Sequence, residues 1–185
     1  MTGHAQLKLT RTAGFSLDVA FDIPEDGVTA LFGPSGCGKT TVLRCIAGLE
    51  KARGRVVVAG RVWQDDAAGI FVPTYARRLG YVFQEASLFD HLNVRQNLEY
   101  GMKRIRDADA AERLAHAVEL LGIGHLLERR TNELSGGERQ RCAIARSLAV
   151  KPTILLMDEP LASLDNARRR EILPWLEKLR KELSI

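Results

Sequence analysis

One eight-residue run near the N-terminus constrains the fold more than any other part of this sequence. Residues 33–40 read Gly-Pro-Ser-Gly-Cys-Gly-Lys-Thr and match the phosphate-loop pattern G-x-x-x-x-G-K-[ST] at every fixed position. The pattern is informative only between a strand and a helix, and both flanks fit. The mostly apolar residues 28–32 predict a short buried strand, and residues 41–48 predict a helix closed by Gly48.

The residues of this loop are those that a polyphosphate requires. Glycines allow backbone N–H groups to turn inward around the anion, and the helix N-terminus adds partial positive charge. Lys39 can reach the β- and γ-phosphates, and the Thr40 hydroxyl can ligate Mg²⁺. An ordinary glycine turn is the weaker alternative, because the Lys-Thr pair and both flanks are present. We therefore predict a nucleoside triphosphate site formed by Gly33, Pro34, Ser35, Gly36, Cys37, Gly38, Lys39, Thr40 and Thr41.

Composition narrows the class of protein. With 185 residues, 45% hydrophobic and 27% charged, the chain is expected to form one soluble domain. No apolar stretch approaches the ~20 residues of a membrane span, and no signal-peptide pattern is present. The three cysteines form no CxxC pair, so a reducing cytoplasm is expected. The net charge of +4 is mild, and the basic clusters have few aromatic neighbours, so we expect no nucleic-acid partner.

The apolar pattern predicts alternating strands and helices, as in a mainly parallel α/β sheet. Period-two spacing predicts an N-terminal antiparallel hairpin, and helical spacing predicts a helical subdomain inserted into the core. A charged helix kinked at Pro174 is expected near the end. The predicted elements are a hairpin at 6–10 and 15–21, strands at 55–59, 80–83 and 154–157, the helical subdomain at about 93–150, and a helix at 166–183.

The predicted strand 154–157 ends in two acids. A carboxylate at the carboxyl end of a buried strand is well placed to meet a metal ion held by Thr40, so we predict that Asp158 ligates Mg²⁺ directly or through water. Glu159 could then orient or deprotonate the attacking water. Two solvated acids at a strand end are the simpler alternative.

Residues 134–140, Leu-Ser-Gly-Gly-Glu-Arg-Gln, predict a second donor-rich anion site at a helix start. One triphosphate does not need two such sites from one chain. With this second site, the chain resembles the nucleotide-binding domain of ABC transporters. The signature motif of that family closes over the ATP held by the other protomer. The resemblance implies a homodimer sandwiching two ATP molecules, with Ser135 and Gly137, and Gly136 between them, at the partner's γ-phosphate.

Two further positions fit the same family. Gln84 resembles the Q-loop glutamine, which senses Mg²⁺ and water and lies beside the groove for the membrane subunit. Residues 163–165 resemble the D-loop, whose aspartate, here Asp165, spans the dimer interface. Four motifs in the family's order over residues 33–165 imply an α/β phosphate-loop NTPase of the ABC ATPase type, covering residues 1–185.

A closer resemblance is to the ATPases of molybdate importers. It is carried by residues 80–89, His91, Val94, 97–98, 100–101, 120–123, 159–165 and 172–174. It implies a subunit peripheral to the cytoplasmic face of the inner membrane, bound to permease subunits and indirectly served by a periplasmic oxyanion-binding protein. The cargo, molybdate or tungstate, rests on similarity alone.

The chain departs from the family pattern in two ways. The adenine-stacking aromatic has no clear counterpart near residues 10–12. Phe15 could substitute for it, but its alternation with Leu17 and Val19 favours packing in the hairpin, so the base contact is unassigned.

The second departure is the family's switch histidine, which none of the four histidines matches (His4, His91, His116 and His125). The strand that carries it would lie in the middle of the sheet, so we expect these residues to be the front portion of a longer protein, with the C-terminal part of the core missing. The segment alone could bind nucleotide without turnover. A non-transport ABC ATPase acting on DNA or ribosomes is the other alternative, although no long coiled-coil insertion is present.

Overall fold

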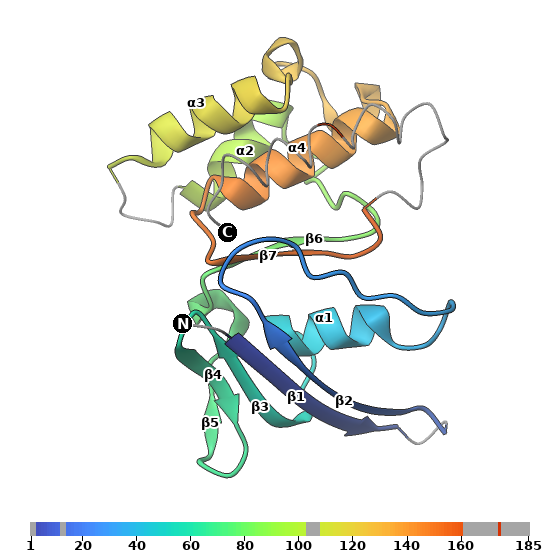
Figure 1. Cartoon of the computed structure of the whole chain (residues 1–185). Helices are drawn as coiled ribbons and strands as arrows, with labels where there is room; N and C mark the ends of the chain where they lie inside the picture. Colours follow the sequence, from blue (N-terminus) through green and yellow to red (C-terminus); the bar gives the residue numbers. More distant parts are fainter. Residues whose placement is uncertain (1–2, 12–13, 103–107, 161–173, 175–185) are drawn as a thin grey trace. The chain divides into compact units, whose positions relative to one another are not determined.

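The computed structural model describes residues 3–11, 14–102, 108–160 and 174. The chain divides into two compact units, the first from the N-terminus to Arg78 and the second from Leu79 onward (Figure 1). The predicted helix at 166–183 lies outside the described residues apart from Pro174, which is helical and exposed.

The first unit contains a five-stranded antiparallel sheet in the order β2-β1-β3-β4-β5. Period-two alternation places Ala5 and Leu7 of β1 fully inside. Leu7 is opposite Val19 on one side and Gly54 on the other, so the predicted N-terminal hairpin is confirmed. The strands are β1 (Gly3–Thr10), β2 (Ser16–Ile23), β3 (Arg53–Val58), β4 (Arg61–Asp65) and β5 (Ile70–Phe71).

Helix α1 (Lys39–Ala47) follows the phosphate loop and confirms the predicted helix. Its apolar side buries Val42, Cys45 and Ile46. Gly48 ends it in the left-handed region at φ 76°, which glycine adopts at little cost, and its N–H donates to the carbonyl of Cys45 at 3.0 Å.

Arg77 ties the end of α1 to the sheet. This side chain is only 4% exposed and follows the 3₁₀ turn η1 (Thr74–Ala76). Its guanidinium donates to the carbonyls of Ile46 at 2.5 Å and Cys45 at 3.3 Å, and lies over the rings of Trp63 and Phe71. The Ile46 carbonyl belongs to the last turn of α1, where no intrahelical donor follows, so Arg77 satisfies it and adds a second donor to the Cys45 carbonyl that Gly48 already contacts.

The prediction of a buried strand at residues 28–32 is wrong. The segment has no regular structure, with Val28 70% and Phe32 93% exposed. A strand requires a neighbouring strand for its backbone hydrogen bonds, and no described strand pairs with this segment. An apolar composition alone does not supply that partner.

The second unit is built on the parallel pair β6 (Leu79–Val82) and β7 (Ile154–Met157). Among the described strands, this pair is the parallel part of the predicted α/β fold. It confirms the strands predicted at 80–83 and 154–157. Gly80 permits close packing by α4: a Cβ at this position would lie 3.0 Å from the Cβ of Ser147 and 2.8 Å from Leu155 Cδ1.

Three helices form the predicted helical subdomain (Figure 1). They are α2 (Val94–Met102), α3 (Ala110–Leu120) and α4 (Gly136–Leu148), joined by the 3₁₀ turns η2 (Gly124–Leu126) and η3 (Thr131–Glu133). Their shared core consists of side chains no more than 2% exposed: Leu98, Leu120, Leu121, Ile123, Leu126 and Ile144. Among the described residues, no helix has the length and hydropathy of a membrane span.

Replacing Arg77 by alanine tests the link between α1 and the sheet. The change removes the guanidinium that donates to the Ile46 carbonyl, so we expect the free energy of unfolding to fall by about 3 kcal/mol. The measurement is urea denaturation. Arg61→Ala, at an exposed position on β4, is the control and should change stability by less than about 0.5 kcal/mol. Equal stability of the two variants would contradict this role.

Candidate functional site

The predicted phosphate loop forms a turn that leads directly into α1. The N–H of Cys37 donates to the carbonyl of Pro34 at 3.3 Å, and that of Val42 to the carbonyl of Gly38 at 2.9 Å. Gly36 and Gly38 have φ values of 80° and 102°, in the left-handed region that favours glycine. The loop conformation therefore favours glycine at both positions: at 38, where the motif requires it, and at 36, where the motif allows any residue.

Lys39 lies across the start of this loop. Its ammonium donates to the carbonyls of Gly33 and Pro34, both at 3.0 Å. The positive charge is thus held at the start of the loop, and the first-turn N–H groups of α1 have no carbonyl partner within the helix. Thr40 is exposed, whereas Thr41 is buried at 8% exposure and belongs to the helix packing.

Phe15, for which the sequence favoured hairpin packing over a base contact, borders the loop. A Cβ at position 38 would lie 2.9 Å from the Phe15 ring and 3.3 Å from Leu17 Cδ1. The ring is half-buried, and the guanidinium of Arg11 lies 5.5 Å from its centre. Phe15 therefore packs against the helix start that carries Lys39, and Gly38 is needed for this close approach. The period-two pattern placed it in the hairpin but gave no sign of this neighbour.

The acidic edge of the second unit brings together three predicted residues. In the parallel register Val82 is opposite Met157, so β6 and β7 end at the same edge. Asp158 follows β7 directly, and its N–H donates to the carbonyl of Val82 at 2.9 Å. Gln84 comes two residues after β6. The segments that carry Gln84, Asp158 and Glu159 therefore leave the parallel pair at the same edge.

The two acids have different surroundings. Asp158 is only 5% exposed, whereas Glu159 is exposed. Glu159 has φ 44°, and a residue with a side chain enters this left-handed region only at a cost that the surrounding structure must offset. Strained backbone of this kind concentrates at functional positions, which supports a chemical role for Glu159.

The predicted second anion site is the N-terminus of α4. Ser135 is the N-cap, and its hydroxyl oxygen accepts a hydrogen bond from the N–H of Glu138 at 3.3 Å. The Glu138 carboxylate accepts one from the N–H of Ser135 at 2.7 Å, completing a capping box. The N–H groups of Gly136 and Gly137 lie in the first turn, where no intrahelical carbonyl is available.

Glu138 is a residue whose role the sequence analysis missed. The hydrogen bonds from Ser135 lower the pKa of the Glu138 carboxyl, because they favour its charged form. The signal was present as Ser followed three residues later by Glu, the capping-box pattern. Part of the signature motif therefore serves to start the helix.

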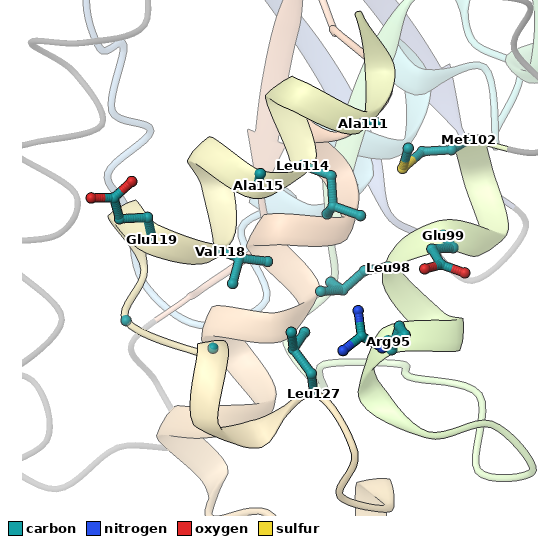
Figure 2. A pocket seen from close by; sticks show the side chains of 12 residues that line it. Arg95, Leu98, Glu99, Met102, Ala111, Leu114, Ala115, Val118, Glu119 and Leu127 are labelled. Carbon is teal, nitrogen blue, oxygen red and sulfur yellow. The ribbon is translucent and has the colours of Figure 1, made fainter.

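A groove of about 760 Å³ lies within the helical subdomain. Figure 2 shows Leu98, Leu114, Val118 and Leu127 facing it from α2, α3 and the turn after η2. Arg95 lies among them and also forms an ion pair with Glu128 at 2.7 Å. The groove is an apolar surface with charged side chains at its margin.

The predicted site residues thus fall into two groups. Residues 33–41 form one site in the first unit. Gln84 with the two acids, and Ser135 with its two glycines, lie in the second unit. Asp165 lies outside the described residues. Within the part of the chain that the structure describes, no group of three or more His, Cys, Asp or Glu residues could hold a metal ion.

These features are those of an ATP-binding cassette, and comparison with known families agrees. The family described as "ABC transporter" matches residues 17–162, so the chain belongs to this family. This confirms the fold class predicted from the motifs. The family's motifs at residues 33–40 and 134–138 both lie at helix N-termini, as described above.

The sequence is 63% identical over 174 residues to the molybdenum import ATP-binding protein ModC 1 of Azotobacter vinelandii, covering 94% of this chain and 48% of that protein. The chain therefore spans about half the length of the curated relatives it matches. Two solved structures are similar in fold. One is cbiO1 of Clostridium perfringens, part of the transporter complex cbiONQ (TM-score 0.83, 30% identity, 100% of this chain and 75% of that one). The other is the dimeric ATP-binding cassette MJ0796 with ADP and Pi (TM-score 0.77, 29% identity, 98% and 84%).

The cysteines provide a test of ligand binding at the loop. Burial raises the pKa of the Cys45 thiol to about 11 and that of Cys142 to about 12, whereas Cys37 is exposed in the loop. An alkylating reagent acts on the thiolate, so it should label Cys37 alone in the native protein. We expect ATP to slow this labelling at least about ten-fold, because a bound phosphate covers the loop.

The readout is mass spectrometry of the labelled peptides, with Cys45 and Cys142 as internal controls. In Lys39→Ala, Cys37 should be labelled at the same rate with and without ATP, because the cation that pairs with the phosphates is gone. Labelling of Cys37 at the same rate with and without saturating ATP would exclude nucleotide at this loop.

Proposed function

We propose that this chain is the ATP-binding and ATP-hydrolysing part of a subunit that energises import of an oxyanion, molybdate, through a membrane permease. The observation that carries the proposal is the presence of two features in one chain: a glycine loop with Lys39 at the start of α1, and a strand edge followed by Gln84, Asp158 and Glu159. The similarity to a molybdenum import ATP-binding protein supports the choice of cargo.

In this proposal the triphosphate is bound by the N–H groups of residues 33–41. The Lys39 ammonium leaves the carbonyls of Gly33 and Pro34 and pairs with the β- and γ-phosphates, an exchange of weak acceptors for charged ones. Thr40, Gln84 and Asp158 would hold Mg²⁺. Their hydroxyl, amide and carboxylate oxygens suit this hard cation, which neutralises the charge of the phosphates when bound.

Glu159 then acts on water. Its carboxylate takes a proton from the water as the oxygen attacks the γ-phosphorus, and the bond to the β-phosphate oxygen breaks to release ADP. Gln84 orients this water from the neighbouring strand end. The exposed position of Glu159 beside the buried Asp158 supports this division between metal ligand and base.

The proposal includes a homodimer. Ser135, Gly136 and Gly137 of one subunit would contact the γ-phosphate held by the other, and Asp165 would lie at the interface. The support is chemical, because the first turn of α4 offers N–H donors to an anion. The solved structure of MJ0796, to which this chain is similar, is dimeric and holds ADP and Pi.

The permease partner is assigned to the groove between α2 and α3. Its apolar lining suits the apolar face of a short helix, and Arg95, Glu99 and Glu119 at the margin suit a polar rim. The subunit would thus lie on the cytoplasmic face of the inner membrane, and a periplasmic oxyanion-binding protein would deliver cargo to the permease. The groove favours this assignment over an ABC ATPase acting on nucleic acid.

Glu159→Gln in the full-length protein tests the hydrolytic role. The amide cannot accept the proton, so we expect ATP turnover to fall at least about 100-fold while ATP remains bound. Phosphate release, filter retention of labelled ATP and uptake of labelled molybdate by cells measure the effect. Glu112→Gln, at an exposed position on α3, is the control and should leave all three unchanged. Rapid turnover by Glu159→Gln would exclude Glu159 as the base.

Ala111→Glu tests the groove. Ala111 is exposed and lines the groove, so the added carboxylate should disrupt apolar docking without disturbing the helix. We expect co-purification with the permease to fall by about ten-fold or more. His116→Glu adds the same charge to α3 at an exposed position that does not line the groove and should retain the permease. Equal loss in both variants would argue against this surface.

A further inference from the structure

The loop that follows Gln84 is held by side chains from two helices. Residues 84–93 contain no helix or strand. Ser87 lies in the left-handed region at φ 37°, and its hydroxyl donates to the carbonyl of Glu85 at 2.9 Å. A serine in this conformation needs support from its surroundings. That support comes from outside the loop.

Asn97 of α2 provides the first contact. Its side chain is fully buried, and its oxygen accepts from the N–H of Phe89 at 2.8 Å. Its amide nitrogen donates to the carbonyls of Phe89 at 3.1 Å and Asn93 at 3.0 Å. Asn97 thus replaces the backbone partners that an irregular segment lacks.

Arg146 of α4 provides the second contact. One nitrogen of its guanidinium donates to the carbonyl of Ser87 at 3.0 Å, and the other lies 3.5 Å from the Asn97 oxygen. The guanidinium carbon lies 5.2 Å from the centre of the Phe89 ring, within the range of a cation–π contact. Phe89 also packs on Tyr100 of α2, with ring centres 4.5 Å apart. A single side chain of α4 therefore touches the loop at two residues and α2 at one.

Arg146 and the signature residues belong to the same helix. Ser135 caps the first turn of α4, and Arg146 lies in its last turn. A helix of 13 residues is about 20 Å of stiff backbone, so a displacement at one end is passed to the other. Only four residues lie between Gln84 and Phe89, so fixing residues 87 and 89 restricts where Gln84 can lie.

We propose that Arg146 is a positioning residue that links the signature helix to the Gln84 loop, so that a shift of α4 moves Gln84. The consequence for hydrolysis rests on the proposed function above, whereas the restraint on the loop does not. Arginine suits this task because its planar group offers separate donors and a flat face to the ring at the same time.

Arg146→Ala in the full-length protein tests the restraint by hydrogen exchange. We expect the amides of residues 85–89 to exchange about ten-fold faster or more, because a charged hydrogen bond and a ring contact are lost. The amides of α1 should be unchanged. Arg146→Lys retains a charged donor and should recover part of the protection. Arg61→Ala, on β4, is the matched surface control. Unchanged exchange at 85–89 in Arg146→Ala would overturn the proposal.

Kinetics test the consequence for Gln84. We expect Arg146→Ala to lower kcat for ATP about ten-fold while KM changes less than about two-fold, because water is misplaced but the phosphate loop is intact. Arg146→Lys should recover part of kcat. A parallel loss of kcat and thermal stability, unrelieved by lysine, would reduce Arg146 to a packing residue and overturn the link. Absence of turnover in the unaltered protein would contradict the proposed function, while the exchange result would still decide the restraint.

Discussion

Four residues of β6 pair in parallel with four residues of β7, and this short ladder determines where the polar residues of the second unit lie. Parallel strands end at the same edge, so the segments that carry Gln84 and Asp158 leave the sheet at one edge, although 73 residues lie between these two residues in the chain. The pairing depends in turn on Gly80, which lets α4 approach the strand closely. A larger residue there would push away the helix that carries Ser135 and Arg146.

In the first unit, the main structural feature is a helix N-terminus that is exposed to solvent. Gly36 and Gly38 turn the chain, while Arg77 secures the opposite end of α1 to the sheet. The helix is therefore fixed at its C-terminal end and presents its donors at the other. Such an arrangement keeps donors in place before an anion arrives, which reduces the cost of ordering them on binding.

Local motifs were predictable from the sequence, whereas contacts between distant segments were not. The phosphate loop and the helix after it follow from glycine and lysine positions within eight residues, and the parallel strand at 154–157 follows from its apolar run. The prediction of a strand at 28–32 was wrong because a strand needs a neighbouring strand to pair with, and composition does not reveal one. Two further contacts could not be predicted from the sequence: Phe15 with Gly38, and Arg146 with Ser87. Each joins segments that are distant in the chain, and no repeating pattern links them.

The capping box at the start of α4 also affects the strength of the second anion site. Glu138 places a negative charge one turn from the N–H groups of Gly136 and Gly137, where it offsets the positive end of the helix dipole. The carboxylate that stabilises the fold therefore repels a phosphate at the same helix end. In the proposed dimer, weaker binding of the phosphate at this helix end would help the two subunits to separate after hydrolysis.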